Sequence, residues 1–305
     1  MMNKVIRIGT RDSQLALWQA HTVENQLQAL GYKTQIVPVK SAGDLKLDTP
    51  LYELGITGIF TKTLDVAMLN NTVDIAVHSL KDVPTALPKG IVQAAVLKRA
   101  STLDIIVTKE LIDYKMPLTI ATGSLRRKAQ WLHKYPTHTV VDLRGNVNTR
   151  LQKLQDNSWQ GAIFAKAGLE RIDVLPSRYT SLDWMTPAPA QGAMTIVALE
   201  KDPFCIEAAQ KLNDTPSQIC TQIERDFLRT LEGGCTAPIG ALAKIEGETI
   251  QFKGCLLSLD GTKKIAIEKT ISLQFAAKAG DAIAKEVLQK GGDVLLKEIK
   301  AAMNL

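Results

Sequence analysis

The chain has 305 residues, of which 45% are hydrophobic and 22% charged, a composition typical of a globular protein with more than one domain. No segment approaches the ~18 uninterrupted apolar residues of a membrane span, which excludes a protein that crosses a bilayer on helices. Lysine and arginine (37) exceed aspartate and glutamate (31). The resulting net charge of +6 would favour binding to nucleic acid, to an anionic surface or to a polyanionic small substrate.

The N-terminal residues and the cysteines bear on location and metal binding. Residues 1–9 lead straight into a strand-like alternation, without the basic start, apolar run and cleavage site of a secretory signal. We therefore expect a cytoplasmic protein. The cysteines are too few and too far apart for a disulfide framework or a zinc site, so we expect reduced thiols and no metal centre. They are Cys205, Cys220, Cys235 and Cys255.

The first part of the chain alternates strands with helices. The apolar patterns predict strands over 4–9, 34–39 and 74–78, with helices over 13–30 and 61–69 between them. This alternation favours a mostly parallel sheet covered by helices on both faces.

A second series of strands and helices begins after Arg99. It comprises predicted strands over 105–107, 119–121, 139–141 and 162–165, and helices over 124–133 and 146–155. Residues 187–189 then break the pattern, and we expect a buried strand over 194–198 that returns to the first sheet. Two α/β lobes joined by two crossings form a cleft that commonly holds a ligand, unless the lobes pack rigidly and nothing binds between them.

After Pro216 the pattern changes to a long helix that ends near Leu231. Strands are predicted over 239–244, 249–257 and 264–271, followed by two helices. This order indicates a small α+β domain with an antiparallel three-stranded sheet. We thus predict three domains, comprising residues 1–98 with 188–214, residues 99–187, and residues 215–305.

A polar segment, residues 78–82, follows the predicted strand 74–78. Ligands of open α/β sheets bind beyond the carboxyl ends of the strands, and this segment lies there. Asp82 is the candidate for acid–base or charge-stabilising chemistry, with Ser79 and Lys81 as ligand contacts. Spacing alone favours the alternative, an aspartate that caps the turn before Pro84.

Arginines gather at the ends of other predicted strands. Ser124 opens a helix at a glycine turn, where free N–H groups and the helix dipole attract anions, and Arg126 and Arg127 follow it. The alternative is a plain Ser124 N-cap with both arginines on a solvated face. Further arginines follow strand ends at Arg11, Arg144 and Arg150. Together they suggest a ligand with several carboxylates or phosphates.

Cys235 lies in a glycine-rich loop beyond the long helix. A free cysteine is usually a small buried apolar residue, and we expect this of the other three cysteines. The Cys235 loop has little apolar material to cover the thiol, so the sulfur is a candidate nucleophile or attachment point. No nearby histidine identifies an activating base.

Taken together, these motifs make the chain similar to the porphobilinogen deaminase (hydroxymethylbilane synthase) family along nearly its whole length. Their order and spacing fit the family, which makes the resemblance more specific than any single motif. The motifs are residues 8–20, 77–84, 124–127, 143–146 with 149–150, 165–171, 231–235 and 238–240.

The resemblance implies three domains, the first two like a class II periplasmic binding protein. It also implies a dipyrromethane cofactor joined to Cys235 by a thioether. On this basis the enzyme is a monomeric transferase of haem and other tetrapyrrole biosynthesis. It deaminates four porphobilinogen molecules, joins them head to tail by C–C bonds, and releases hydroxymethylbilane and ammonia.

The resemblance also implies residue roles. Asp82 is the catalytic residue, which stabilises positive charge on pyrrole nitrogens and moves protons. The implied cofactor contacts are Ser79, Lys81, Asp82, Thr122, Ser124, Arg126, Arg127, Arg144 and Gly145. The implied substrate contacts are Arg11, Ser13, Lys62, Arg144, Asn146, Arg150, Arg171 and Gln191. The arginines would bind the two carboxylates that each pyrrole carries.

The chain departs from the family pattern at a few positions. Thr57, Thr63 and Ala190 stand where family members usually carry lysine, glutamate and glycine, and Thr195–Ala198 lacks a glutamate. We therefore expect a less basic loop over the active site and a stiffer crossing between lobes.

Two rival functions fit the sequence less well. A solute-binding protein for an anionic ligand would share the two lobes but has no evident need for Cys235 or a third domain. A nucleic-acid partner is not expected, because the positive charge is scattered over loops without aromatic interleaving.

Overall fold

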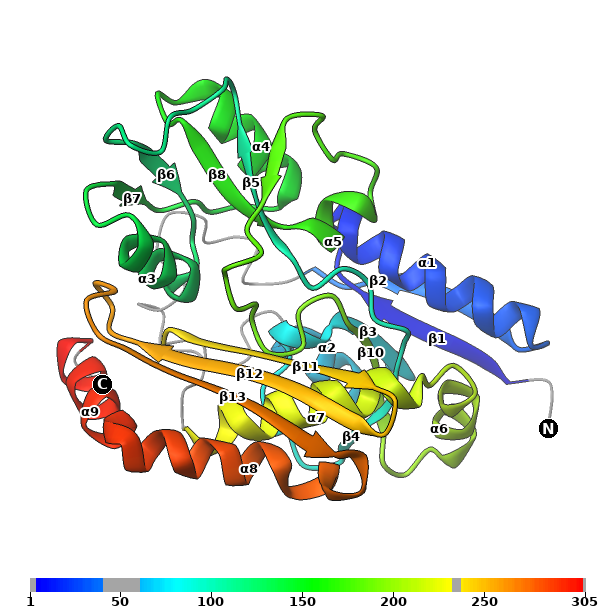
Figure 1. Cartoon of the computed structure of the whole chain (residues 1–305). Coiled ribbons are helices and arrows are strands. Elements are labelled where there is room, and N and C mark those ends of the chain that lie inside the picture. Colours follow the sequence, from blue (N-terminus) through cyan, green and yellow to red (C-terminus); the bar gives the residue numbers. More distant parts are fainter. Residues whose placement is uncertain (1–3, 41–60, 232–236, 304–305) are drawn as a thin grey trace.

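The computed structural model describes residues 4–40, 61–231 and 237–303, which form three units (Figure 1). The first lobe holds a five-stranded sheet in the order β2-β1-β3-β10-β4. Its strands are β1 (Val5–Thr10), β2 (Lys33–Pro38), β3 (Ile75–Ser79), β4 (Ile91–Val96) and β10 (Met194–Leu199). Its helices are α1 (Gln14–Ala29), α2 (Lys62–Leu69) and α6 (Pro203–Gln210), with a short 3₁₀ turn at Leu80–Asp82.

Alternating side chains of the first sheet pack into two cores. On β3, Ile75 and Val77 face α1 and α6, whereas Ala76 between them faces α2. Both faces are thus covered by helices, as predicted. The sheet is mostly parallel, also as predicted, but β10 runs antiparallel to both of its neighbours.

The second lobe repeats this design with the strand order β7-β6-β8-β5-β9. It comprises β5 (Asp104–Thr108), β6 (Thr119–Ala121), β7 (Thr139–Val141), β8 (Gly161–Ala165), β9 (Tyr179–Ser181), α3 (Leu125–Lys134), α4 (Val147–Asp156) and α5 (Lys166–Glu170). Here β5 is antiparallel to its neighbours. In each lobe, the first strand after the crossing from the other lobe therefore runs against the rest.

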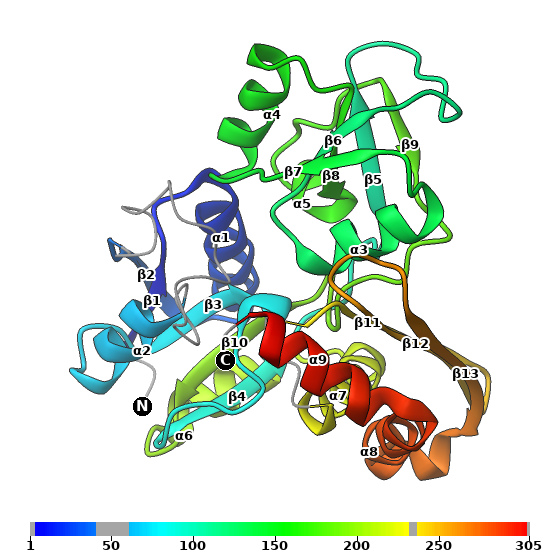
Figure 2. The same cartoon turned by 90° about the vertical axis from the view of Figure 1, so that its left-hand side faces the viewer.

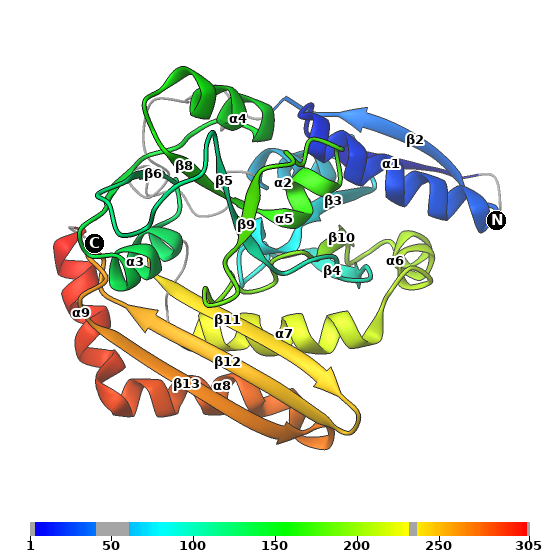
Figure 3. The same ribbon diagram turned by 45° about the horizontal axis from the view of Figure 1, so that its top comes forward.

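The third unit contains the predicted three-stranded antiparallel sheet, and its helices pack on one face of that sheet (Figure 3). It comprises α7 (Thr215–Thr230), β11 (Ile239–Glu246), β12 (Thr249–Leu257), β13 (Lys264–Ser272), α8 (Ala276–Val287) and α9 (Asp293–Ala302). Phe227 of α7 meets Phe252 of β12 edge to face, with ring centroids 5.1 Å apart. In Figure 2 this unit lies below the second lobe and beside the first.

The fold class is confirmed: two α/β lobes precede a small α+β unit. The predicted return of strand 194–198 to the first sheet is confirmed by β10. Among the described strands and α-helices, those not predicted from the sequence are β4, β9, α5 and α6. Among the described helices, none has the length and apolar content to cross a membrane. The domain limits given above remain a prediction.

Candidate active site

The predicted site residues follow the carboxyl ends of strands in both lobes. In the first lobe, β1 and β3 are parallel neighbours, so the turns after Thr10 and Ser79 lie at one edge of the sheet. In the second lobe, β6 and β7 are parallel neighbours, and the turns after Ala121 and Val141 share an edge in the same way.

Asp82 ends the 3₁₀ turn that follows β3, and its side chain is exposed. Within the described ranges no hydrogen bond reaches its carboxylate, so the capping alternative finds no support. Burial lowers the pKa of Lys81, Arg127 and Arg150, and the negative charge of Asp82 opposes this lowering in all three. Asp82 of the first lobe therefore lies close to arginines of the second.

Burial dominates the titration of these cations. It lowers the pKa of Lys81 to about 8, and the nearby charge of Arg127 acts in the same direction. Burial and Arg127 likewise lower the pKa of Arg150 to about 10. The cations repel one another, so an anion bound among them would be stabilised by all of them.

The sequence did not predict the centre of this arrangement, the buried carboxylate of Asp104. Arg126 donates to it at 2.6 and 3.2 Å, Arg127 through Nε at 2.9 Å, and the amide of Gln191 at 3.0 Å. We call these four residues the Asp104 cluster. Burial would raise the pKa of Asp104, but the two arginines hold it well below its usual range.

The solvated-face alternative for Arg126 and Arg127 is wrong, because both side chains are buried. Ser124 does cap α3, accepting the N–H of Arg127, so that half of the alternative is confirmed. Much of the donor capacity of each guanidinium is used by Asp104 and by the backbone carbonyls of Thr186 and Ile163. Asp104 therefore offsets part of the positive charge that the arginines offer to a ligand.

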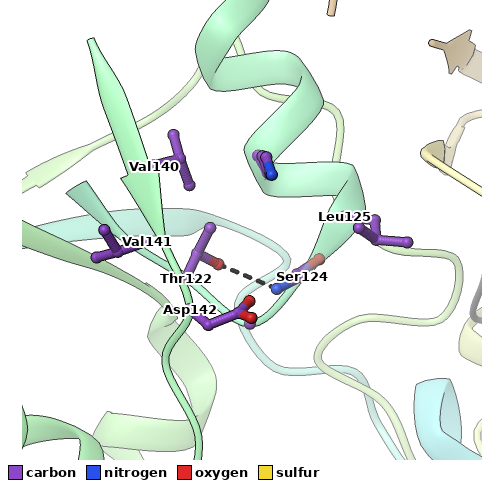
Figure 4. A pocket seen from close by; sticks show the side chains of 8 residues that line it. Thr122, Ser124, Leu125, Val140, Val141 and Asp142 are labelled. Atoms are coloured by element: carbon purple, nitrogen blue, oxygen red, sulfur yellow. Dashed lines mark hydrogen bonds between the residues drawn. The ribbon is translucent and has the colours of Figure 1, made fainter. Parts of the chain in front are cut away.

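The turns after β6 and β7 approach each other closely. A Cβ at Gly123 would lie only 2.5 Å from the carbonyl oxygen of Leu143, so this contact requires glycine. A cavity of about 90 Å³ lies at the start of α3 (Figure 4). It is lined by Thr122, Gly123, Ser124, Leu125, Lys128, Val140, Val141 and Asp142. Neither Arg126 nor Arg127 lines it.

The turn after β7 carries three more predicted residues. Arg144 is buried, and burial lowers its pKa while Asp142 opposes the effect. Asn146 caps α4 by accepting the N–H of Thr149 at 2.9 Å, and Arg150 donates to the Gly145 carbonyl at 2.7 Å. These bonds fix Arg150 beside the turn that holds Arg144.

Some buried nitrogen atoms at this edge have no hydrogen-bond partner. Among the described residues, no hydrogen-bond partner is found for Arg126 Nε, Arg144 Nη1 or His78 Nε2. Leaving such a group unsatisfied costs about 1–3 kcal/mol, more when the group is charged. Two orphaned guanidinium nitrogens among mutually repelling cations suit a ligand that carries several carboxylates.

Gln191 connects this edge to the crossing between the lobes. Its buried amide donates to Asp104 and to the Thr102 carbonyl at 2.8 Å, and its oxygen accepts from Lys81 at 3.4 Å. Lys81 and Asp104, which come from different lobes, are thus joined through one side chain.

Ser79 accepts a hydrogen bond from buried Gln19 of α1 at 2.8 Å.

Other predicted residues have different surroundings. Arg171 donates to the Gly192 carbonyl at 2.7 Å and lies over the ring of Trp18, and burial lowers its pKa to about 10. Ser13 caps α1, Arg11 is half-buried, and Lys62 is exposed at the start of α2. Thr63 is half-buried on α2, while Thr57 and Cys235 lie outside the described residues.

The three described cysteines are buried, as predicted. Burial raises the pKa of Cys205 to about 12, and it also raises the pKa of Cys220 and of Cys255. None of the three therefore offers an accessible thiolate near neutral pH.

Comparison with known proteins identifies the family. Residues 6–207 match the model "Porphobilinogen deaminase, dipyromethane cofactor binding domain", and residues 218–289 match "Porphobilinogen deaminase, C-terminal domain". The porphobilinogen deaminase of Campylobacter fetus subsp. fetus is 40% identical over 296 residues, which cover 96% of this chain and 97% of that protein. The porphobilinogen deaminase of Nitratiruptor sp. is also 40% identical, over 302 residues and 97% of each chain.

Solved structures give a weaker likeness. A periplasmic substrate-binding protein from Coxiella burnetii is 13% identical, covers 70% of this chain and 93% of its own, and has a TM-score of 0.43. This likeness adds nothing to the strand orders described above. Both family models and the near full-length relatives show that the chain belongs to the porphobilinogen deaminase family, transferases of tetrapyrrole biosynthesis with a dipyrromethane cofactor.

Proposed function

We propose that this chain joins porphobilinogen units head to tail at Asp82, with the arginines of the second lobe binding the pyrrole carboxylates. The observation that carries the proposal is a chain of hydrogen bonds between the lobes: Lys81, the neighbour of Asp82, donates to Gln191, which donates to Asp104 beside Arg127. A carboxylate among cations suits a substrate that bears both carboxylates and a developing positive charge.

Each addition breaks the C–N bond of the substrate's aminomethyl group, releases ammonia, and forms a C–C bond to a pyrrole α-carbon that loses its proton. Departure of ammonia leaves positive charge on the substrate ring. The fixed carboxylate of Asp82 would stabilise this charge beside the pyrrole nitrogen and take part in the proton transfers. Arg144, Arg150 and Lys81 would orient the substrate through its carboxylates.

The described residues fit the dipyrromethane cofactor, because a group with several carboxylates would supply acceptors for the orphaned nitrogens of Arg126 and Arg144. When bound, this cofactor provides the pyrrole to which the first unit is added. We propose Cys235 as its attachment point. The burial of Cys205, Cys220 and Cys255 supports this choice, since the chain has four cysteines.

The remaining expectations belong to the same proposal. The chain would act in the cytoplasm as a monomer on a small-molecule substrate. Its three domains would comprise residues 1–98 with 188–214, residues 99–187, and residues 215–305, so that Asp82, the arginines and Cys235 come from different domains.

Intact-protein mass spectrometry tests the attachment. Protein made in cells that produce porphobilinogen should carry an added mass equal to two linked pyrrole units, mapping to Cys235. Cys235→Ser should lose the added mass, whereas the control Cys220→Ala should keep it. An adduct that persists in Cys235→Ser would refute the assignment.

Replacement of Asp82 tests the catalytic role. Asp82→Asn keeps the shape but removes the charge, so the rate of hydroxymethylbilane formation should fall by about 10²–10⁴-fold. The exposed Asp183 offers a control, because Asp183→Asn makes the same change away from the site. Near-normal turnover in Asp82→Asn would remove Asp82 from the mechanism.

A further inference from the structure

Arg225 of α7 reaches out of the third unit and holds the backbone of the Asp82 segment. Its buried guanidinium donates to the carbonyls of Leu80 at 3.2 Å, Val83 at 2.8 Å and Pro84 at 2.6 Å. These carbonyls lie on both sides of Asp82 in the chain. One side chain therefore fixes the segment immediately before and immediately after the proposed catalytic carboxylate.

Other contacts also restrain the segment, because Leu80 and Val83 are buried in an apolar cluster with Ala193. The N–H of Leu80 donates to Ala193 at 3.0 Å, and the N–H of Val83 donates to Leu80 at 3.2 Å. The 3₁₀ turn spans only three residues, Leu80–Asp82. The apolar contacts hold the side chains of Leu80 and Val83, whereas the three bonds from Arg225 fix the backbone carbonyls on both sides of Asp82.

The chemistry at Arg225 is specific for a guanidinium. Among the described residues Arg225 forms no ion pair, and its bonds go to carbonyl oxygens only. Burial lowers its pKa to about 10, which still leaves it charged at neutral pH. A planar fork with several N–H groups reaches three carbonyls at once, whereas a lysine ammonium has a shorter reach and no fixed geometry.

Helix α7 also connects two parts of the proposed active site. It packs beside β4 of the first lobe (Figure 2), and it ends at Thr230, five residues before Cys235 in the sequence. Glu224, the residue before Arg225 in α7, accepts the N–H of Ala190 in the second crossing at 2.6 Å. It also forms an ion pair with Arg99 at 2.7 Å. Successive residues of one helix thus hold the crossing and the Asp82 segment.

We propose that Arg225 is a positioning residue, which fixes the carboxylate of Asp82 relative to the unit that carries the attachment cysteine. The inference rests on the proposed role of Asp82. Loss of Arg225 should misplace the carboxylate and leave the carboxylate-binding arginines of the second lobe untouched. Turnover should therefore fall while KM for porphobilinogen stays nearly constant.

Arg225→Lys is the informative variant, and Arg229→Lys is its matched control. Arg229 lies one turn along α7, and its half-exposed side chain pairs with Asp226. Arg225→Lys should reduce kcat about tenfold with KM within about twofold, and Arg225→Met should reduce it further. Arg229→Lys should match the unchanged protein. A rise in KM without loss of kcat in Arg225→Lys would overturn the inference.

Hydrogen exchange gives a readout that does not depend on activity. Amides of the segment that includes Val83 should exchange faster in Arg225→Lys than in Arg229→Lys, while the core of the third unit remains protected. Intact mass should show that the cofactor is still attached in both variants. Unchanged exchange in the Asp82 segment would show that Arg225 does not hold it.

A double-mutant cycle separates this inference from the proposed function. If Arg225 acts through Asp82, Arg225→Lys should slow addition of the first pyrrole unit in the natural background and have less than about twofold effect in Asp82→Asn. Equal effects in both backgrounds would overturn the role of Arg225 alone. Near-normal turnover of the single variant Asp82→Asn would instead overturn the proposed function of Asp82.

Discussion

Nη1 of Arg126 lies 2.6 Å from Oδ2 of Asp104, and both side chains are buried. The same carboxylate accepts a hydrogen bond from Arg127, so the single negative charge of Asp104 stabilises two guanidinium groups. The pair of arginines can therefore remain charged and ordered before any anionic ligand arrives. On the proposed function, Asp104 would order the two arginines, and the remaining positive charge would bind substrate carboxylates.

Removal of the Asp104 charge should be costly for stability. Asp104→Asn leaves two buried guanidinium groups without a counter-charge, and we expect a loss of about 3–5 kcal/mol in the free energy of unfolding. Urea denaturation measures the loss, with Asp183→Asn as the exposed control. A loss below about 1 kcal/mol, the size of an exposed pair, would contradict the assigned role.

The stability that Asp104 provides should also depend on pH in a defined direction. Its folded-state pKa lies below the value of an unfolded aspartate, so its contribution is present above about pH 4. The contribution is lost as the pH falls toward the folded-state pKa. The difference in stability between the natural protein and Asp104→Asn should therefore shrink in acid.

Lys81 should produce an alkaline limb in the pH profile of kcat/KM. Its pKa near 8 means that its positive charge disappears as the pH rises through that value. If the ammonium binds a substrate carboxylate, kcat/KM should fall by up to about tenfold per pH unit above this point. Lys81→Arg stays charged and should lack the limb.

The substrate's own ionisations affect the natural protein and Lys81→Arg equally, so they cancel in the ratio of the two profiles. Lys81→Gln should show at neutral pH the low kcat/KM that the natural protein reaches only in alkali. A limb near pH 8 that persists in Lys81→Arg would assign the ionisation to another group.

The Arg144 side chain should lower the stability of the cofactor-free protein and strengthen substrate binding. Its Nη1 is buried without a partner among the described residues, so Arg144→Met should stabilise cofactor-free protein by about 1–3 kcal/mol. The same variant should raise KM for porphobilinogen, because a carboxylate donor is lost. Thermal unfolding and initial rates measure the two effects, with exposed Arg178→Met as the control. A destabilised Arg144→Met protein would show that the guanidinium is already satisfied.

Local signals in the sequence predicted most of the fold. The apolar patterns of the strands and helices located most elements of both lobes and of the third unit, and Ser124 caps α3 as one interpretation predicted. The strands β4 and β9 and the helices α5 and α6 were missed. For β4 and α6, tertiary contacts with β10 decide the structure.

The interior of the site could not be predicted in the same way. Asp104 meets Arg127 across 23 positions, and Arg225 meets Val83 across 142, so no local spacing reveals these contacts. One signal was present: Glu224, Arg225 and Asp226 are consecutive charges in a helix with an apolar face, and all three are buried. Charges on the buried side of such a helix indicate partners elsewhere in the fold.

The departure at Ala190 has a measurable cost. Ala190 is fully buried and adopts φ 62°, a left-handed conformation that costs a non-glycine residue about 1–2 kcal/mol. Glycine relieves this strain but makes the unfolded chain more flexible, which offsets about 0.4–1 kcal/mol. Loss of the buried methyl group offsets a further ~0.8 kcal/mol, so Ala190→Gly should leave the free energy of unfolding nearly unchanged. The N–H of Ala190 would still donate to Glu224.

Ala193 provides the matched control, since it is equally buried, lies in the same crossing and has no positive φ. Ala193→Gly should destabilise the protein, because it removes a packed methyl group and relieves no strain. Urea denaturation should therefore show Ala190→Gly to be less destabilising than Ala193→Gly by about 1–2 kcal/mol, the strain that only Ala190 carries. Destabilisation by Ala190→Gly of the size found for Ala193→Gly would mean that the Ala190 methyl contributes more to packing than its backbone costs in strain. In that case the alanine at this position would be an adaptation of the crossing, and the strain would be the lesser effect.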